Sequence, residues 1–186
     1  MVEKRKRPAK RKLAARRVEK ERPSDVAEGK CIIAVRLRGQ AGIPDNVDSV
    51  LDMLHMPRRY NAVLIYESPD TLGMLRKVKD YVTWGEIGKE SLAMLFEKRC
   101  RPKGAKELTA NCLKDRLQIP SIEKLADAVG RAEIPMSRLY EAGISPVFRL
   151  HPPRGGFKKT VKRSFTDEGE LGYRGPEISS LILRMI

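Results

Sequence analysis

The chain has 186 residues, among them 38 lysines and arginines and 24 aspartates and glutamates, so its formal charge at pH 7 is +14. Hydrophobic residues make up 41%, which suits one compact domain with extensions or two small domains and is too many for a chain disordered throughout. No stretch approaches the roughly 18 apolar residues of a membrane span, and no apolar run follows the basic start as in a secretory signal. The charge predicts a polyanionic partner, either nucleic acid or an acidic membrane surface.

The first 28 residues have the composition of a basic arm. Residues 1–23 contain eleven lysines and arginines against three glutamates, a surplus of eight, with few aliphatic side chains. We expect this segment to be disordered alone and to take shape on a polyanion, as a helix over 9–21, because it buries too little apolar surface to offset the entropy of ordering. A solvated tail or a nuclear-type targeting signal is the alternative. The side chains expected to neutralise phosphates are Lys4, Arg5, Lys6, Arg7, Lys10, Arg11, Lys12, Arg16 and Arg17.

Residues 29–87 show the pattern of a small β-α-β-α-β core. Segments rich in β-branched and aromatic residues predict three strands, at 31–38, 61–66 and 81–84. Apolar residues recur at helical spacing after Asp45 or Asn46, either of which can cap the first helix. Ser68, followed by a proline, predicts the cap of a second helix that runs to about Asp80. Both helices are expected to cover one face of the sheet, which is the α+β class.

Beyond residue 87 the pattern becomes mainly helical. Helical spacing predicts helices over 89–100, 107–117, 121–131, about 136–142 and 176–185. Residues 146–150 are consistent with a strand, and residues 169–175 with a loop or a strand. We therefore divide this part into a helical extension, 88–150, and a C-terminal part, 151–186, whose basic glycine loop and helix pack on the core.

A second basic block, residues 149–163, contains six lysines and arginines and no acid. It includes the segment PPRGGFKK, in which the prolines favour an extended backbone and the glycines permit positive φ and close approach to another molecule. Phe157 can stack on a base while Lys158 and Lys159 contact phosphates. An ordinary exposed loop with solvated lysines is the alternative interpretation.

Side chains suited to catalysis or metal binding are few. His151 lies in the basic block and suits a phosphate or a base better than catalysis, and His55 suits the end of a helix. No G-x-x-x-x-G-K-[ST] spacing is present around the glycines. The three cysteines are far apart and indicate reduced thiols in a cytosolic protein, not disulfides or a zinc site: Cys31, Cys100 and Cys112. We therefore expect no enzyme activity, no metal and no cofactor.

Three motifs together resemble one known family. They are GMLRKVKDYVTWGE at 73–86, SPVFRLHPPRGGFKK at 145–159 and GELGYRG at 169–175. They resemble the large-subunit ribosomal protein called L-thirty in bacteria and archaea and L-seven in eukaryotes, and the RLHPPRGG block is like the archaeal form. The resemblance covers about 29–186. It implies a structural component of the cytoplasmic ribosome that binds the large ribosomal RNA in the region of the 5S RNA, beside neighbouring ribosomal proteins.

The resemblance also implies a fold and a set of contacts. The fold is a small three-stranded antiparallel sheet with two helices, related to ferredoxin-like folds, without catalysis or a cofactor. In bacterial members an arginine at the matching strand exit meets ribosomal RNA, which implies that role for Arg38. Strand alternation can direct Arg36 to the open face of the sheet instead. The residues of the folded part expected to bind RNA are Arg36, Arg38, Arg58, Arg59, His151, Arg154, Gly155, Gly156, Phe157, Lys158, Lys159, Lys162 and Arg163.

The function expected is that of a structural constituent of the large ribosomal subunit, which stabilises folded RNA during translation. A general RNA- or DNA-binding protein of the chromatin type is the alternative, because the arm suits it equally well, although residues 145–175 lack a helix-turn-helix or zinc pattern. An RNA-modifying enzyme requires an acid, base, metal or cofactor site that the sequence does not display. A peripheral membrane protein requires large apolar residues opposite basic ones on one helix.

Overall fold

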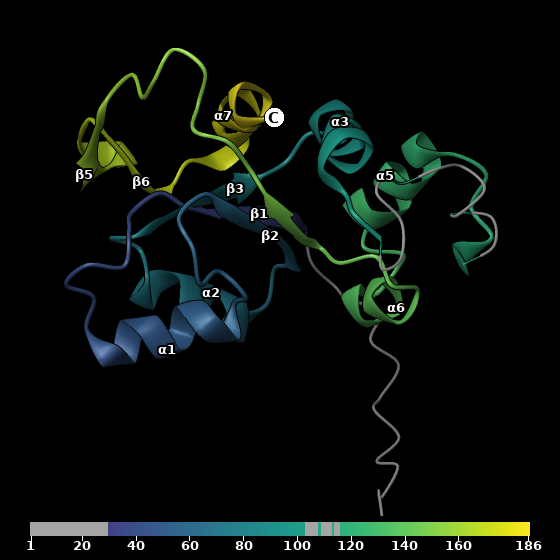
Figure 1. The fold of residues 1–186 in the computed structure, drawn as a ribbon, viewed down its shortest axis with the longest axis horizontal. Coiled ribbons are helices and arrows are strands. Elements are labelled where there is room, and N and C mark those ends of the chain that lie inside the picture. Colours follow the sequence, from purple (N-terminus) through teal and green to yellow (C-terminus); the bar gives the residue numbers. More distant parts are fainter. Residues whose placement is uncertain (1–29, 103–107, 109–112, 114–115) are drawn as a thin grey trace, which may run out of the picture.

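Figure 1 shows the chain as a computed structural model, which describes residues 30–102, 108, 113 and 116–186. The elements in chain order are β1 (Cys31–Arg36), α1 (Asp45–Met53), β2 (Asn61–Tyr66), α2 (Pro69–Lys77), β3 (Val82–Glu86), α3 (Lys89–Arg99), α5 (Ile122–Gly130), α6 (Met136–Glu141), β4 (Val147–Arg149), β5 (Thr160–Ser164), η1 (Phe165–Asp167), β6 (Gly169–Tyr173), η2 (Gly175–Glu177) and α7 (Ile178–Met185). Leu113, Arg116 and Leu117 are also helical, within the predicted segment 107–117, most of which lies outside the described residues. None of the helices described is both long and apolar enough to cross a membrane.

The strands form one mixed sheet in the order β4-β2-β1-β3-β6-β5. β1 pairs antiparallel with β2 and β3, and β2 pairs antiparallel with β4, whereas β6 runs parallel to both β3 and β5. The predicted three-stranded antiparallel sheet is therefore only the middle of a six-stranded one, and the predicted strand number is wrong. The sequence failed to predict β5 because its residues, TVKRS, are mostly exposed and show no apolar alternation.

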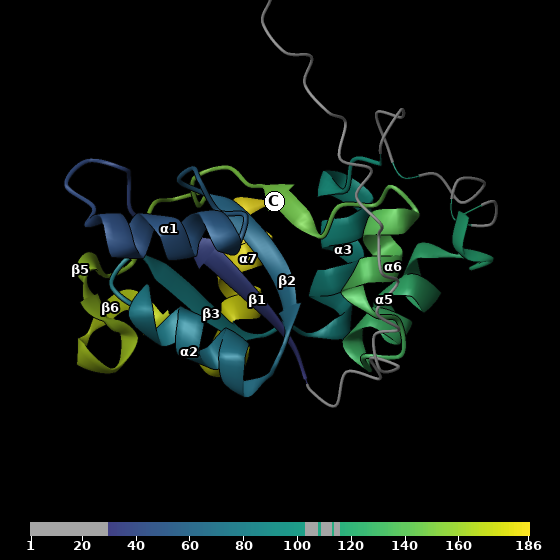
Figure 2. The same cartoon turned by 90° about the horizontal axis from the view of Figure 1, so that it is seen from below.

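Both faces of the sheet are covered, which explains why every residue of β1 is buried. Ile32 and Ala34 point to the face covered by α1 and α2, where they pack with Leu51 and Leu75. The alternate residues of β1 belong to a larger cluster with α3, α5, α6 and α7 on the other face. Figures 1 and 2 show α1 and α2 together on one side of the sheet, and α7 and α3 on the other. The prediction that the first two helices share one face is confirmed.

A side-chain cap marks the start of α2, whereas α1 begins without one. Ser68 caps α2 as predicted, and it forms a capping box in which its hydroxyl accepts from the Thr71 N–H while the Thr71 hydroxyl accepts from the Ser68 N–H. The predicted cap at Asp45 or Asn46 is wrong, because the capping position of α1 is Pro44 and no side chain caps this helix. Asp45 instead lies in the first turn, where its charge is favourable near the positive end of the helix dipole.

Candidate nucleic-acid interface

One end of the sheet collects most of the predicted basic residues. In the strand register, Arg36 at the end of β1 pairs with Val82, and Asn61 at the start of β2 pairs with Arg149 at the end of β4. β6 and β5 run parallel to β3, so the start of β5 lies at this same end. The glycine loop, residues 151–159, joins β4 to β5 there (Figure 1). We call this region the cationic end; its exposed basic side chains are Arg58, Arg59, Arg149, Arg154, Lys158, Lys159, Lys162 and Arg163.

Arg36 is not part of that surface, which corrects its prediction as an RNA contact. Its side chain is fully buried and donates only to backbone carbonyl oxygens. Nη1 donates to Met56 and Pro57 at 2.7 and 2.8 Å, Nε to Arg38 at 3.1 Å and Nη2 to Gly39 at 3.3 Å. Burial lowers the pKa of Arg36, and the nearby carboxylates of Asp48 and Asp52 oppose that shift. Arg36 therefore ties the loop after β1 to the turn before β2.

The arginines around this buried group are oriented by the backbone and by aromatic rings. Arg38 is half-buried; its Nη1 donates to the Asp80 carbonyl at 3.2 Å, and its guanidinium lies 5.0 Å from the centre of the Tyr81 ring. Arg59 is exposed, donates from Nε to the Leu37 carbonyl at 2.8 Å and lies 4.6 Å from the Tyr60 ring. Each guanidinium keeps further N–H groups for an external acceptor, because it carries five.

The glycine loop is held in place by α7, which the sequence did not indicate. Gly155 and Gly156 have φ of +74° and +72°, a conformation that side chains disfavour, and the Gly156 N–H donates to the Pro153 carbonyl at 2.9 Å. Arg184 on α7 donates to the carbonyls of Arg154 and Gly156, and the Arg154 N–H donates back to the Arg184 carbonyl at 2.8 Å. The loop thus presents exposed side chains from a fixed backbone.

The far side of the loop is anchored by a buried ion pair that sequence reasoning also missed. Glu170 accepts from the Lys159 N–H at 2.9 Å and pairs with Arg174, and both charged side chains are more than nine-tenths buried. The Phe165 ring lies 5.4 Å from the Lys159 ammonium and 4.7 Å from the Arg174 guanidinium. The sequence signal for this pair is its spacing. Glu170 and Arg174 are four residues apart, and residues four apart in an extended strand point to the same face.

Two predicted RNA contacts, Phe157 and His151, differ in their exposure to solvent. Phe157 is half-buried and packs against the large core cluster, and its contact with a base stays a prediction. His151 is exposed, and its backbone N–H donates to the Met185 carbonyl at 3.0 Å. The predicted contacts from Lys4 to Arg17 lie outside the described residues.

Nothing in the described ranges groups three or more histidine, cysteine, aspartate or glutamate side chains as a metal site would. Burial raises the pKa of the Cys31 thiol to about 12, so this thiol stays protonated at neutral pH and is a poor nucleophile. Cys112 lies outside the described residues.

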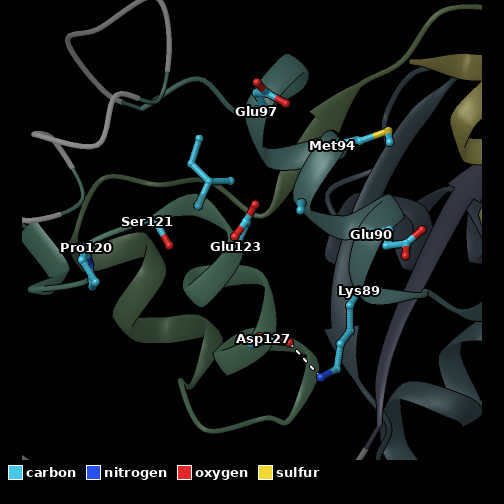
Figure 3. A pocket seen from close by; sticks show the side chains of 10 residues that line it. Lys89, Glu90, Met94, Glu97, Pro120, Ser121, Glu123 and Asp127 are labelled. Atoms are coloured by element: carbon cyan, nitrogen blue, oxygen red, sulfur yellow. Dashed lines mark ion pairs between the residues drawn. The ribbon is translucent and has the colours of Figure 1, made fainter.

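A groove at the other end of the molecule has the opposite charge. It lies between α3 and α5 and has a volume of about 780 Å³, and the charged residues of its lining are four acids and one lysine: Glu90, Glu97, Glu123, Asp127 and Lys89. Figure 3 shows Glu123 pointing from α5 toward α3, and Lys89 Nζ bonded to Asp127 Oδ1 at 2.9 Å. Figure 1 places α5 and β5 at opposite ends of the long axis. Phosphate groups are therefore favoured at the cationic end and disfavoured at this groove.

Comparison with known proteins points to one family. The family model described as ribosomal protein L30p/L7e matches residues 32–82. The large ribosomal subunit protein uL30 of Aeropyrum pernix is 44% identical over 153 residues, which cover 82% of this chain and 96% of that protein. The uL30 protein of Hyperthermus butylicus is 41% identical over 94% of this chain and its own whole length, and that of Staphylothermus marinus is 45% identical over 82% of this chain.

Proposed function

Because the chain belongs to the ribosomal protein L30p/L7e family, in its archaeal type, we propose that it is a structural constituent of the large ribosomal subunit that binds and stabilises folded ribosomal RNA. Its place of action is the ribosome in the cytoplasm, and its partners are ribosomal RNA and neighbouring ribosomal proteins. Members of this family are structural proteins and not enzymes, so no cofactor or substrate enters the proposal.

The cationic end is the observation that carries the proposed function. Eight exposed lysines and arginines lie there on a sheet end and a loop whose backbone is fixed by Arg36, Arg184 and the Glu170–Arg174 pair. A fixed backbone keeps these cations close to the phosphates of a folded RNA, because little loop entropy remains to be lost on binding. Guanidinium groups bind phosphate through two parallel hydrogen bonds, and ammonium groups act as point charges.

Specificity in this arrangement comes from the shape of the RNA. Phosphate contacts fix register and orientation but read no sequence, so the spacing of Arg38, Arg59 and Arg154 selects an RNA by its fold. The basic arm, residues 1–28, adds phosphate contacts with little sequence preference. We assign the remaining parts as the core, 29–87, the helical extension, 88–150, and the C-terminal part, 151–186.

Direct competition tests this function against the chromatin-type alternative. The full-length protein is mixed with a labelled fragment of large-subunit ribosomal RNA, and either the unlabelled fragment or duplex DNA of equal length is added at constant salt. We expect the RNA to displace the labelled fragment at far lower concentration than the DNA does, because the cations are spaced for a folded RNA. Equal displacement by the two competitors would instead support general nucleic-acid binding.

A variant set locates the binding surface. Replacing Arg154, Lys158 and Lys159 by alanine is expected to weaken RNA binding and assembly into subunits while leaving circular dichroism and the melting temperature nearly unchanged, because all three side chains are exposed. The matched control removes three exposed cations on or next to α5 and α6, away from the cationic end: Lys124, Arg131 and Arg138. If the control weakens binding as much as the loop variant, net charge and not the cationic end determines affinity.

A further inference from the structure

A small cavity lies beneath the glycine loop, between that loop, β6 and the start of α7. Its volume is about 180 Å³, well below the roughly 300–1,000 Å³ of a drug-sized ligand site. Four basic side chains line it, together with two acids, a serine, a phenylalanine and a leucine: Lys158, Lys159, Arg174, Arg184, Glu170, Glu177, Ser180, Phe165 and Leu181. A cavity of this size and composition suits a small polar group and excludes a nucleotide.

One of these basic side chains is buried with a hydrogen-bond donor left over. The Arg174 side chain is 7% exposed; its Nη2 donates to the Glu170 carboxylate and, at 2.9 Å, to the Glu170 carbonyl. Its Nε is buried and has no partner among the described residues. Buried polar groups are nearly always hydrogen-bonded, and a charged donor loses most when it is not. The missing partner is therefore an acceptor.

The charge of the lining indicates that this acceptor is an anion. Glu170 is already paired with Arg174. Within the described part of the chain, no carboxylate pairs with Lys158, Lys159 or Arg184, so three cations face one further acid, Glu177. The cavity has a surplus of two positive charges, which favours an anion and disfavours a metal cation.

The walls of the cavity are held by contacts within the chain. Arg184 fixes the loop through the carbonyls of Arg154 and Gly156, and Glu170 holds the backbone of Lys159 at 2.9 Å. A site whose donors are already positioned loses little entropy when it binds a ligand.

We propose that this cavity binds one phosphate group, and that the group is a backbone phosphodiester of the ribosomal RNA. Arg174 Nε and the ammonium groups of Lys158 and Lys159 donate to its oxygens, as charge-assisted hydrogen bonds to phosphate do in general. The RNA origin of the phosphate rests on the proposed function, whereas the affinity of the cavity for phosphate does not.

The side-chain Nε–H resonance of Arg174, observed by NMR on the full-length protein, tests the site directly. Sodium phosphate is titrated against sodium chloride at matched ionic strength. We expect a saturable shift of this resonance with phosphate and none with chloride, because only phosphate offers the missing acceptor. The absence of any phosphate-specific shift would overturn the proposal without requiring a variant.

Two exposed side chains provide a variant and its control. Lys158→Ala is expected to weaken the phosphate-dependent shift about fivefold in apparent Kd, the order expected for one exposed charge contact. Lys77→Ala removes an exposed cation from the last turn of α2 that does not line the cavity, and its titration should match that of the unaltered protein. Equal weakening by both variants would show a diffuse charge effect and contradict a site.

A fragment of large-subunit ribosomal RNA then identifies the source of the phosphate. We expect RNA binding to shift the same Arg174 resonance and inorganic phosphate to compete with it. If RNA binds but leaves the resonance unchanged, the cavity is not an RNA subsite although the proposed function stands. If inorganic phosphate binds and RNA does not, the proposed function fails, and the assignment to an RNA phosphodiester fails with it.

Discussion

Arg36 is a basic strand residue that stabilises the fold and does not form part of the surface proposed to contact RNA. It is a fully buried cation whose hydrogen-bond acceptors among the described residues are neutral carbonyl oxygens, two of them on the turn before β2. Strand alternation places it on the opposite face from Val35, but alternation alone does not distinguish an open face from a buried polar site. The sequence therefore identified Arg36 as basic and in β1, and it could not identify its carbonyl partners, which are up to 21 residues away.

Removing this guanidinium should destabilise the protein. We expect Arg36→Met to lower the free energy of unfolding by about 2–4 kcal/mol, because the carbonyls of Met56 and Pro57 lose a charged donor inside the protein. Urea unfolding followed by circular dichroism measures the change. The control, Arg58→Met, alters an exposed arginine two residues before Tyr60 and should stay within about 0.5 kcal/mol. Unchanged stability of Arg36→Met together with weakened RNA binding would restore Arg36 as a contact residue.

The elements of the core were predictable because their signals are local. β2 has the predicted bounds, and α2 begins at the predicted Ser-Pro step and ends three residues before Asp80. The outer strands were less predictable, because a short edge strand is held by backbone hydrogen bonds to its neighbour and needs no apolar pattern of its own. β4 lies within the segment 146–150 that the sequence indicated and has three residues, whereas β5 is mostly exposed and lacks the buried alternation that identifies a strand. Their membership of the sheet is decided by pairing with β2 and β6, which is a long-range property.

The junction of β3 with η2 is one place where long-range packing constrains a residue type. A side chain at Gly85 would clash with the backbone of Gly175, including its carbonyl oxygen. We expect Gly85→Ala to lower the free energy of unfolding by about 2–3 kcal/mol, since the strand has to move away from η2. The comparison is Gly73→Ala in α2, where nothing lies within 4 Å of the added carbon and the helix should gain about 0.5–1 kcal/mol. Thermal unfolding of both variants shows whether the two changes in the free energy of unfolding have opposite signs. An unchanged stability of Gly85→Ala would show that η2 moves aside at little energetic cost.

At the scale of the whole molecule, the cationic end and the acidic groove lie apart. The cationic end contains most of the predicted site residues of the folded part, since β1, β2, β4 and the glycine loop meet there. Composition predicted the amount of charge, and the resemblance indicated where it acts. Neither indicated the acidic groove between α3 and α5, because its acids are scattered from Glu90 to Asp127 and come together only when the helices pack. The arrangement favours RNA at the cationic end, since phosphate is attracted there and is disfavoured at the acidic groove.

This separation predicts how the affinity for RNA depends on salt. If the protein neutralises about 6–10 phosphates, its affinity should fall by roughly 10³–10⁵ between 50 and 200 mM salt, because bound counterions are released from the RNA. Each cation removed from the cationic end should reduce the slope of log affinity against log salt by about one, so Arg154→Ala with Lys158→Ala is expected to reduce it by about two. The same number of cations removed from α5 and its C-terminal end, Lys124→Ala with Arg131→Ala, should leave the slope unchanged, since these residues lie outside the cationic end. Filter-binding titrations across that salt range measure all three slopes.

A flat salt response of the unaltered protein would exclude phosphate neutralisation as the source of its affinity for RNA. Equal slopes for the two double variants would exclude the cationic end as the location of the phosphate contacts.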